Sequence, residues 1–330
     1  MRPKISVCIS VHNTEKYLPR CLDSIINQSL LDIEIVLVNN GSTDNSEKIM
    51  YRYQENHPER VIKVIRQDDK GLAQGRQTGI DNATGEFLTF LDADDYYLST
   101  TAFEELYEVA KKNDIDIVEF ETIREGKVLC SKYEGIHKSK DVLDDYFIHG
   151  ANQMLWLRIY KKSLFNKTVM PGFYTNNEDI YGYPCLLYSA SSILYYHKPL
   201  HNYSSDNETS VMTKYKNDTS YADKYFNNSF KALRAIKHIK AYLGIEVINE
   251  RYKESFPLFV CTSIINTVLN KTYNNITWRQ IEKSIIENTD FDTYQEVNDY
   301  IKSHFKKKGL TYFLIKTIGL KYTYYIKKQL

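Results

Sequence analysis

The chain has 330 residues, 42% of them hydrophobic and 26% charged, which is typical of a globular protein with a substantial core. Its formal net charge of +1 argues against a dedicated nucleic-acid-binding protein. The charge is unevenly distributed, because residues 301–330 contain eight Lys and no Asp or Glu, which leaves −7 for the first 300 residues. We therefore expect the basic tail to meet an anionic surface.

Five cysteines are scattered along the chain without a Cys-x-x-Cys pair, so we expect a reducing compartment and no disulfide framework. The apolar run after the basic start is broken by Ser10, His12 and Asn13, which makes it too short for a secretory signal. A spanning helix needs about 20 mostly apolar residues, and no segment meets that requirement. These features favour a cytoplasmic protein without a membrane span.

The first 120 residues alternate short β-branched runs with helical patterns, which predicts a parallel sheet covered by helices. The predicted strands are Ile5–Val11, 33–38, 61–65, a segment ending at Asp92, and 115–120. Helices are predicted at Leu18–Ile26, around 49–53, at 73–82 and at 101–112. This order of elements indicates an α/β, Rossmann-like, mostly parallel sheet.

After residue 121 the pattern becomes mixed. We predict a hairpin at Glu125-Gly126, a helix near 141–149 and a strand-like segment at 154–160. Beyond about residue 213 the sequence turns helical and rich in Tyr, Lys and Asn, with no repeat period. Residues 214–330 are therefore predicted to form a C-terminal helical extension.

Three carboxylates follow one apolar strand, because 85–91 leads directly into Asp92-Ala93-Asp94-Asp95. Clustered Asp side chains repel one another and are costly to bury, so this position favours a cation site. An all-oxygen ligand set suits Mg²⁺ or Mn²⁺ better than zinc. The alternative is that this Asp-rich turn only caps a helix that begins near Ser99.

Polar residues also follow the first two strands, Ser10 after one and Asn39 after the other. The carboxyl ends of parallel strands form the ligand-binding edge of an open α/β sheet. For either loop taken alone, local capping by Ser or Asn is the better explanation. Combined with the Asp cluster, the loops predict a site for a polar, phosphorylated ligand.

Four segments together resemble the inverting GT-A glycosyltransferases of family two. They are ISVCISVHN at 5–13, EIVLVNNGSTDNS at 34–46, KGLAQGRQTGI at 70–80 and GEFLTFLDADD at 85–95. Their joint order and spacing over about 100 residues are far more specific than any one motif. The resemblance implies the GT-A fold, with a catalytic domain at 1–213 made of a nucleotide-sugar half (1–120) and an acceptor half (121–213).

The resemblance also implies roles for individual residues. Ser10 and Asn39 would lie beside the nucleotide base, Asp92 near the ribose, and Asp94 on a divalent metal that bridges the diphosphate. The predicted nucleotide-sugar site comprises Ser10, Asn39, Lys70, Asp92, Ala93, Trp156 and Glu178. Lys70 is equally well explained as a surface lysine, and Trp156 as a packed core residue.

The segment YTNNEDIY at 174–181 resembles the family's Glu-Asp motif, in which the Asp is the catalytic base. This implies that Asp179 takes the proton from the acceptor hydroxyl and that Glu178 orients it. Without the resemblance, a Glu-Asp pair in a polar loop is most simply a solvated helix cap. The assignment of Asp179 therefore depends on the family motif.

The chain departs from the family pattern at Asn39-Asn40, where an acidic pair is usual, and at Gln77, where Asn is usual. An amide can still pair with uracil, since it both donates and accepts hydrogen bonds. The Gln-x-x-Arg-Trp motif and the membrane helices of processive members are absent from the sequence. The sequence thus predicts transfer of one sugar from a nucleotide donor, favoured to be UDP-linked.

The expected acceptor is a hydroxyl of a glycan or lipid-linked glycan in cell-surface polysaccharide synthesis. The rival hypothesis, motivated by Asn39-Asn40, is a catalytically inactive nucleotide-sugar-binding or scaffold protein of the same fold. A nucleotidyltransferase is disfavoured, because the sequence has no early Gly-rich phosphate loop bearing Arg or Lys. The tail at 305–328 alternates cations with aromatic residues, which fits peripheral contact with the inner membrane face or packing on the catalytic domain.

Overall fold

The computed structural model describes residues 2–143, 154–166, 178–208 and 277–287, and the single positions 210, 213, 295, 296, 298, 299 and 302. The chain divides into two compact units. One comprises Met1–Leu143 and Asn152–Asn207, and the other comprises Asp144–Ala151 and Glu208–Leu330. The first unit holds the sheet and all the predicted site residues. The domain boundary at 213 and the division at 120 stay predictions.

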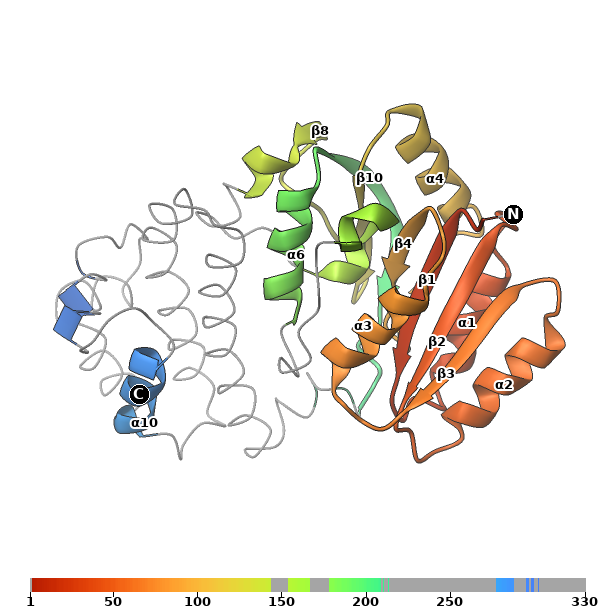
Figure 1. Cartoon of the computed structure of the whole chain (residues 1–330), viewed down its shortest axis with the longest axis horizontal. Coiled ribbons are helices and arrows are strands. Elements are labelled where there is room, and N and C mark those ends of the chain that lie inside the picture. The colour runs from red at the N-terminus through yellow and green to blue at the C-terminus, as the bar shows by residue number, and fades with distance from the viewer. Residues whose placement is uncertain are drawn as a thin grey trace. The chain divides into compact units, whose positions relative to one another are not determined.

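One half of the sheet consists of four parallel strands (Figure 1). In spatial order they are β3 (Val61–Gln67), β2 (Ile33–Asn40), β1 (Ile5–Val11) and β4 (Phe87–Phe90). β1 and β2 are buried along almost their whole length, as expected for parallel strands with helices on both faces. The predicted βαβαβαβ order is confirmed.

The other half of the sheet mixes directions. β9 (Arg158–Lys161) runs antiparallel between β4 and β6 (Ile117–Arg124), and β6 pairs in parallel with β10 (Ser192–Tyr203). Antiparallel edges are added by β5 (Tyr96–Tyr97), β7 (Lys127–Leu129) and β8 (Gly135–Lys138).

Two local predictions in this half can be compared with the structure. The predicted hairpin joins β6 to β7 through Glu125 and Gly126, both with positive φ (51° and 76°), as a two-residue turn requires. The strand-like interpretation of 154–160 is wrong for its first residues. There η1 (Leu155–Leu157) is a 3₁₀ turn closed by a hydrogen bond from Leu157 N to Met154 O, and the strand begins at Arg158.

The main core lies where α1 (Leu18–Ile26) and α4 (Ala102–Lys112) pack against the sheet, and Met50 of α2 (Ser46–Asn56) joins it. Apolar residues recur at helical spacing along α1 and are fully or almost fully buried, namely Leu18, Cys21, Leu22, Ile25 and Ile26. Each buried Leu or Ile side chain contributes about 1.5 to 3 kcal/mol to folding. The sheet is therefore a rigid support for the loops at its edges.

α3 (Leu72–Asn82) lies unusually close to β1 through two glycines. A Cβ at Gly75 would lie 2.1 Å from Ser10 Oγ, and one at Gly79 would lie 3.0 Å from the Cβ of Cys8. Real Cβ atoms essentially never show the first distance, and the second is unusually tight, so a larger residue at either position requires its neighbour to shift. This close approach brings the rest of α3 to the carboxyl edge of the sheet.

The remaining described helices are η2 (Lys162–Asn166), α6 (Glu178–Ser189) and, in the second unit, α10 (Trp278–Glu287). No described helix combines the length and apolar content needed to cross a bilayer. Most of the predicted helix at 141–149 lies outside the described residues. So do most of the C-terminal extension and, except for Lys302, the basic tail.

Candidate active site

The candidate site lies at the carboxyl edge of the parallel strands. Ser10 belongs to the end of β1, Asn39 and Asn40 end β2, and Asp92–Asp95 follow β4. The segment after β10 reaches the same edge, because Ser204 N donates a 2.7 Å hydrogen bond to Asp95 Oδ1. These loops share one edge because β1, β2 and β4 are parallel and adjacent.

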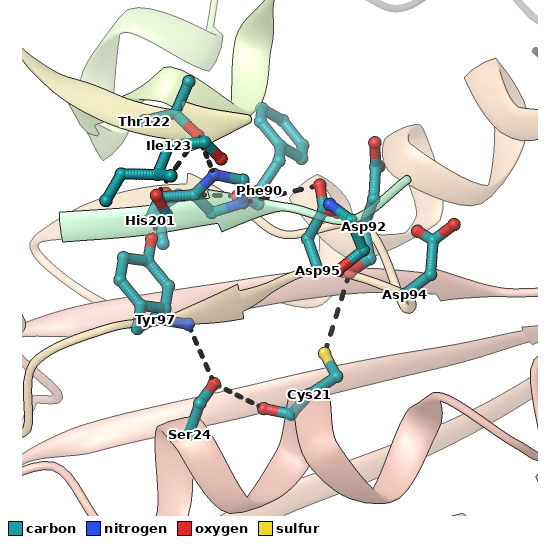
Figure 2. Close-up of polar contacts among 12 residues, drawn as sticks. Cys21, Ser24, Phe90, Asp92, Asp94, Asp95, Tyr97, Thr122, Ile123 and His201 are labelled. Atoms are coloured by element: carbon teal, nitrogen blue, oxygen red, sulfur yellow. Dashed lines mark hydrogen bonds and ion pairs between the residues drawn. The ribbon is translucent and has the colours of Figure 1, made fainter. Parts of the chain in front are cut away.

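Asp95 closes the turn that carries the three carboxylates (Figure 2). Its N–H donates to Asp92 O at 3.0 Å, and its carboxyl group points toward His201, whose Nε2 lies 3.5 Å from Oδ2. His201 is fully buried, and burial lowers its pKa to about 3, so the imidazole is neutral at physiological pH. Asp95 is therefore a structural anchor of the turn.

Asp94 has a different environment. Its carboxyl group points away from His201 (Figure 2). Its Oδ2 accepts a 2.7 Å hydrogen bond from Asn207 Nδ2. Among the described residues, no Lys or Arg forms an ion pair with Asp94. Burial, followed by the charges of Asp95 and Asp92, raises the pKa of Asp94 to about 7. The described residues therefore provide no compensating positive charge for this carboxylate.

A second acidic cluster surrounds Arg76 of α3, whose side chain is 4% exposed. Arg76 Nη2 donates to Asp92 Oδ1 at 2.8 Å, and Nη1 donates to Asp179 Oδ1 at 2.6 Å. Nη1 also donates to Glu178 Oε1. One guanidinium thus joins the turn after β4 to the first residues of α6, and places Asp92 beside both members of the Glu-Asp pair.

Burial dominates the electrostatics of this cluster. It raises the pKa of Glu178 to about 8 and raises the pKa of Asp179, although the charge of Arg76 opposes both shifts. Burial alone would lower the pKa of Arg76, but Glu178, Asp179 and Asp92 raise it. Arg76 therefore stays charged, and its guanidinium, with one positive charge, contacts three carboxyl groups.

The two asparagines that end β2 point to opposite faces of the sheet. Asn40 shares a face with Ser10, since a Cβ at Gly75 would touch both side chains, whereas Asn39 alternates to the other face. The Asn39 amide oxygen accepts from Ser42 N at 2.9 Å. The Asn40 amide group bonds Gln67, Asp69, Gly71 and the Lys70 N–H. Asn40 rather than Asn39 therefore accompanies Ser10, while the nucleotide contact of Asn39 stays a prediction.

Three other predicted residues have clear surroundings. Lys70 is exposed, which leaves the surface-lysine explanation open. Ala93 is 5% exposed and belongs to the main core. Trp156 is 3% exposed and stacks on His201 and Tyr203, with ring centroids 4.6 and 5.5 Å apart. This stacking favours a packed core tryptophan, and its place in a sugar pocket stays a prediction.

The sequence matches a family model described as "Glycosyl transferase family 2" over residues 6–174. The chain belongs to this family. Its relatives include the uncharacterized glycosyltransferase EpsJ of Bacillus subtilis, 41% identical over 118 residues, which are 36% of this chain and 33% of EpsJ. Glycosyltransferase GlyA of Streptococcus pneumoniae is 33% identical over 180 residues, which are 50% of this chain and 25% of GlyA.

Another family relative is the poly(ribitol-phosphate) beta-glucosyltransferase of Bacillus spizizenii, 30% identical over 182 residues, 53% of this chain and 28% of that protein. These matches span well under half of each relative's own length. Among solved structures, S. aureus TarS 1-349 in complex with UDP-GlcNAc has a TM-score of 0.70 at 15% identity, covering 99% of this chain and 90% of that one. The shared fold confirms the predicted GT-A architecture.

The acidic turn of this family-2 chain fits a divalent cation. Within the described ranges, no three His, Cys, Asp or Glu residues are arranged to hold an ion by themselves. Mg²⁺ sites commonly use only one or two carboxylates and take their other ligands from substrate phosphates and water. Asp94 meets that requirement, because it is a partly buried oxygen donor at the ligand-binding edge that forms no ion pair with a described Lys or Arg.

Sequence reasoning missed several residues of this family-2 site. Arg76 lies within the segment that resembles the family, but no role was predicted for it. The available signal was a cation inside a helix predicted to cover the sheet, since a charge buried there must find partners. Asn207 and His201 come from the poorly matched region after residue 121, where their contacts with Asp94 and Asp95 had no sequence signal.

Proposed function

We propose that this chain is an inverting, divalent-metal-dependent glycosyltransferase that moves a single sugar from a UDP-linked donor to a hydroxyl of a glycan or lipid-linked glycan. The observation that carries the proposal is the juxtaposition of Asp92, Asp179 and Glu178 around Arg76, next to Asp94, which pairs with no described Lys or Arg. The names of the relatives support the reaction class. Complexes of TarS with UDP and UDP-GlcNAc support the donor class.

Asp179 is the proposed base. Its carboxylate has room for further hydrogen bonds beyond the one from Arg76, because a carboxylate offers about four acceptor positions. In the transfer, the acceptor oxygen bonds the anomeric carbon, its proton moves to Asp179, and the bond to the donor diphosphate breaks. Attack from the side opposite the leaving group gives an inverted product.

Asp94 is the residue proposed to hold Mn²⁺ or Mg²⁺, which when bound supplies positive charge against the diphosphate leaving group. Ser10, Asn39 and Asp92 are proposed to place the nucleotide, together with Ala93 and Glu178. Lys70 is proposed to add positive charge near the phosphates, and Trp156 to line the sugar pocket. Membrane contact through residues 301–330, at the inner face of the membrane, remains a further proposal.

The proposal is tested by donor turnover. Purified protein with Mn²⁺ is incubated with UDP-GlcNAc, UDP-glucose or UDP-galactose, and release of UDP and the anomeric configuration of the early product are followed by NMR. We expect slow hydrolysis of at least one donor with inversion, water replacing the acceptor. Tight UDP binding without turnover of any donor, even with glycan acceptors added, would instead support the inactive binding protein.

A further inference from the structure

The charge balance around Arg76 restricts how the proposed base works. Asp92, Glu178 and Asp179 all contact one guanidinium, and the Arg76 and Glu178 side chains are only 4% and 2% exposed. Three ionised carboxylates would leave two uncompensated negative charges at this place. Uncompensated buried charge is costly, so such groups usually take up a proton.

Glu178 is the carboxyl group best placed to carry that proton. Asp92 and Asp179 are more exposed, at 30% and 20% of their side chains. A neutral Glu178 keeps a carbonyl oxygen to accept from Arg76, and its O–H is a donor for the adjacent Asp179. Burial raises the pKa of Glu178 to about 8, in agreement with this arrangement.

Arg76 also connects elements that come from distant parts of the sequence. It lies in α3, Asp92 follows β4, and Asp179 is the second residue of α6, 103 residues along the chain from Arg76. The guanidinium packs over the Phe90 ring, with its Cζ 5.6 Å from the ring centroid, which limits its freedom to turn. Two nitrogens of one rigid, planar group therefore set the separation of Asp92 and Asp179.

We propose that Arg76 is a positioning residue that fixes Asp179 relative to the donor-side carboxylate Asp92, with Glu178 acting beside it as a neutral hydrogen-bonding acid. The inference rests on the proposed function, since it needs Asp179 to be the base and Asp92 to lie on the donor side. It adds a physical link between the two sides of the reaction. It also assigns Glu178 a protonation state opposite to that of Asp179.

The first test is Arg76→Lys, which keeps the charge but cannot bridge two carboxylates with a rigid fork. With the UDP-sugar that wild type hydrolyses fastest, we expect kcat to fall about 100-fold, because small misplacements of a catalytic group have effects of that size. The KM for the donor should change less than about threefold. A variant with wild-type kcat, or one with raised KM and unchanged kcat, would contradict the inference.

A second pair of variants avoids stranding a buried charge, so both members should fold. Glu178→Gln imitates the neutral acid, because its NH₂ group can donate to Asp179 and its oxygen can accept from Arg76. Glu178→Ala keeps neither hydrogen bond. We expect the kcat of Glu178→Gln to exceed that of Glu178→Ala by about tenfold or more. Equal values, whether high or low, would rule out a neutral hydrogen-bonding Glu178.

Wild-type turnover separates the two levels of the hypothesis. If wild type binds UDP with Mn²⁺ but hydrolyses no donor, the proposed function fails and the inference fails with it. If wild type turns over a donor and Arg76→Lys does so equally well, only the inference fails. The acid limb of the kcat pH profile adds a readout, because moving Arg76 away from Asp179 should shift that limb to higher pH.

Discussion

Both ends of the parallel sheet contain buried carboxyl groups, but the hydrogen bonds and charges around these groups differ. At the amino end, Glu34 of β2 is completely buried and accepts hydrogen bonds from Ser6 Oγ, from Thr84 N and Oγ1, and from Gly85 N. Lys63 Nζ lies 2.8 Å from Glu34 Oε2. Burial alone would raise the pKa of Glu34, but the bonds from Lys63, Ser6 and Thr84 bring it below its usual value.

At the carboxyl end, hydrogen bonds and positive charges from the described residues do not fully compensate the carboxyl groups. Burial raises the pKa of Asp94 to about 7 and the pKa values of Asp95 and Glu178 to about 8. Glu34 shows that this fold can satisfy a buried acid when its only task is structural. Asp95 at the other end is also structural, but Asp94 has no cation partner among the described residues, so we expect a ligand to supply positive charge there.

The largest expected effect comes from Asp179→Asn. The amide keeps an oxygen to accept from Arg76 but cannot take a proton, so we expect kcat for donor hydrolysis to fall about 1,000-fold. UDP binding in the presence of Mn²⁺ should persist. The matched control is Asp114→Asn at an exposed position with φ 49°, a conformation that Asn tolerates well. Near-normal turnover by Asp179→Asn would remove this residue as the base.

The structural end is tested with Glu34→Ala, which leaves the Thr84 and Gly85 N–H groups and Lys63 without their acceptor. We expect a loss of about 3 kcal/mol in the free energy of unfolding, measured with urea at pH 7. Because the pKa of Glu34 is lowered in the folded state, its contribution is present above its unfolded pKa and is lost as pH falls. A second variant, Glu34→Gln, removes only the charge. The difference in the free energy of unfolding between wild type and Glu34→Gln should therefore decrease below about pH 4.

The control for Glu34→Ala is a variant at an exposed acidic residue. Glu59→Ala, at an exposed residue, should leave the unfolding midpoint unchanged. If Glu34→Ala is as stable as wild type, the contrast between the two ends of the sheet disappears.

Asp94→Asn should raise the free energy of unfolding, whereas Glu34→Ala should lower it. Because the folded state raises the pKa of Asp94 from 3.8 to about 7, wild type without metal loses stability as pH rises across that interval. Removing the charge removes the loss, so we expect the variant to be more stable than wild type by on the order of 2 kcal/mol at pH 8 in EDTA, and equally stable near pH 4. The check is urea unfolding at both pH values. A destabilised Asp94→Asn at pH 8 would contradict the assignment.

Much of the fold could be read from the sequence because the patterns were local. The alternation of apolar strands and amphipathic helices gave β1 and α1 at their observed bounds. Local patterns carried less information where a tertiary contact decides the structure. Residues 155–157 form a 3₁₀ turn in which Trp156 stacks on His201 and Tyr203, whereas the sequence pattern predicted a strand there.

The residues of the site can likewise be separated into those that local sequence predicted and those that depend on distant contacts. The Asp turn after β4 was predictable because three acids in four residues have no packing explanation. The role of Arg76 was not, because its partner Asp179 lies 103 residues away in sequence. The faces of Asn39 and Asn40 were likewise decided by strand register, which a one-residue offset reverses.

At the carboxyl end of the sheet, Asp94 is proposed to hold a cation together with a nucleoside diphosphate. The most direct measurement is thermal unfolding of wild type and Asp94→Ala with UDP or GDP, with and without Mn²⁺. We predict a rise in the midpoint of wild type with UDP that requires Mn²⁺, is absent in Asp94→Ala and is retained in Asp114→Asn. A rise that is equal without Mn²⁺, or equal in Asp94→Ala, would contradict the account.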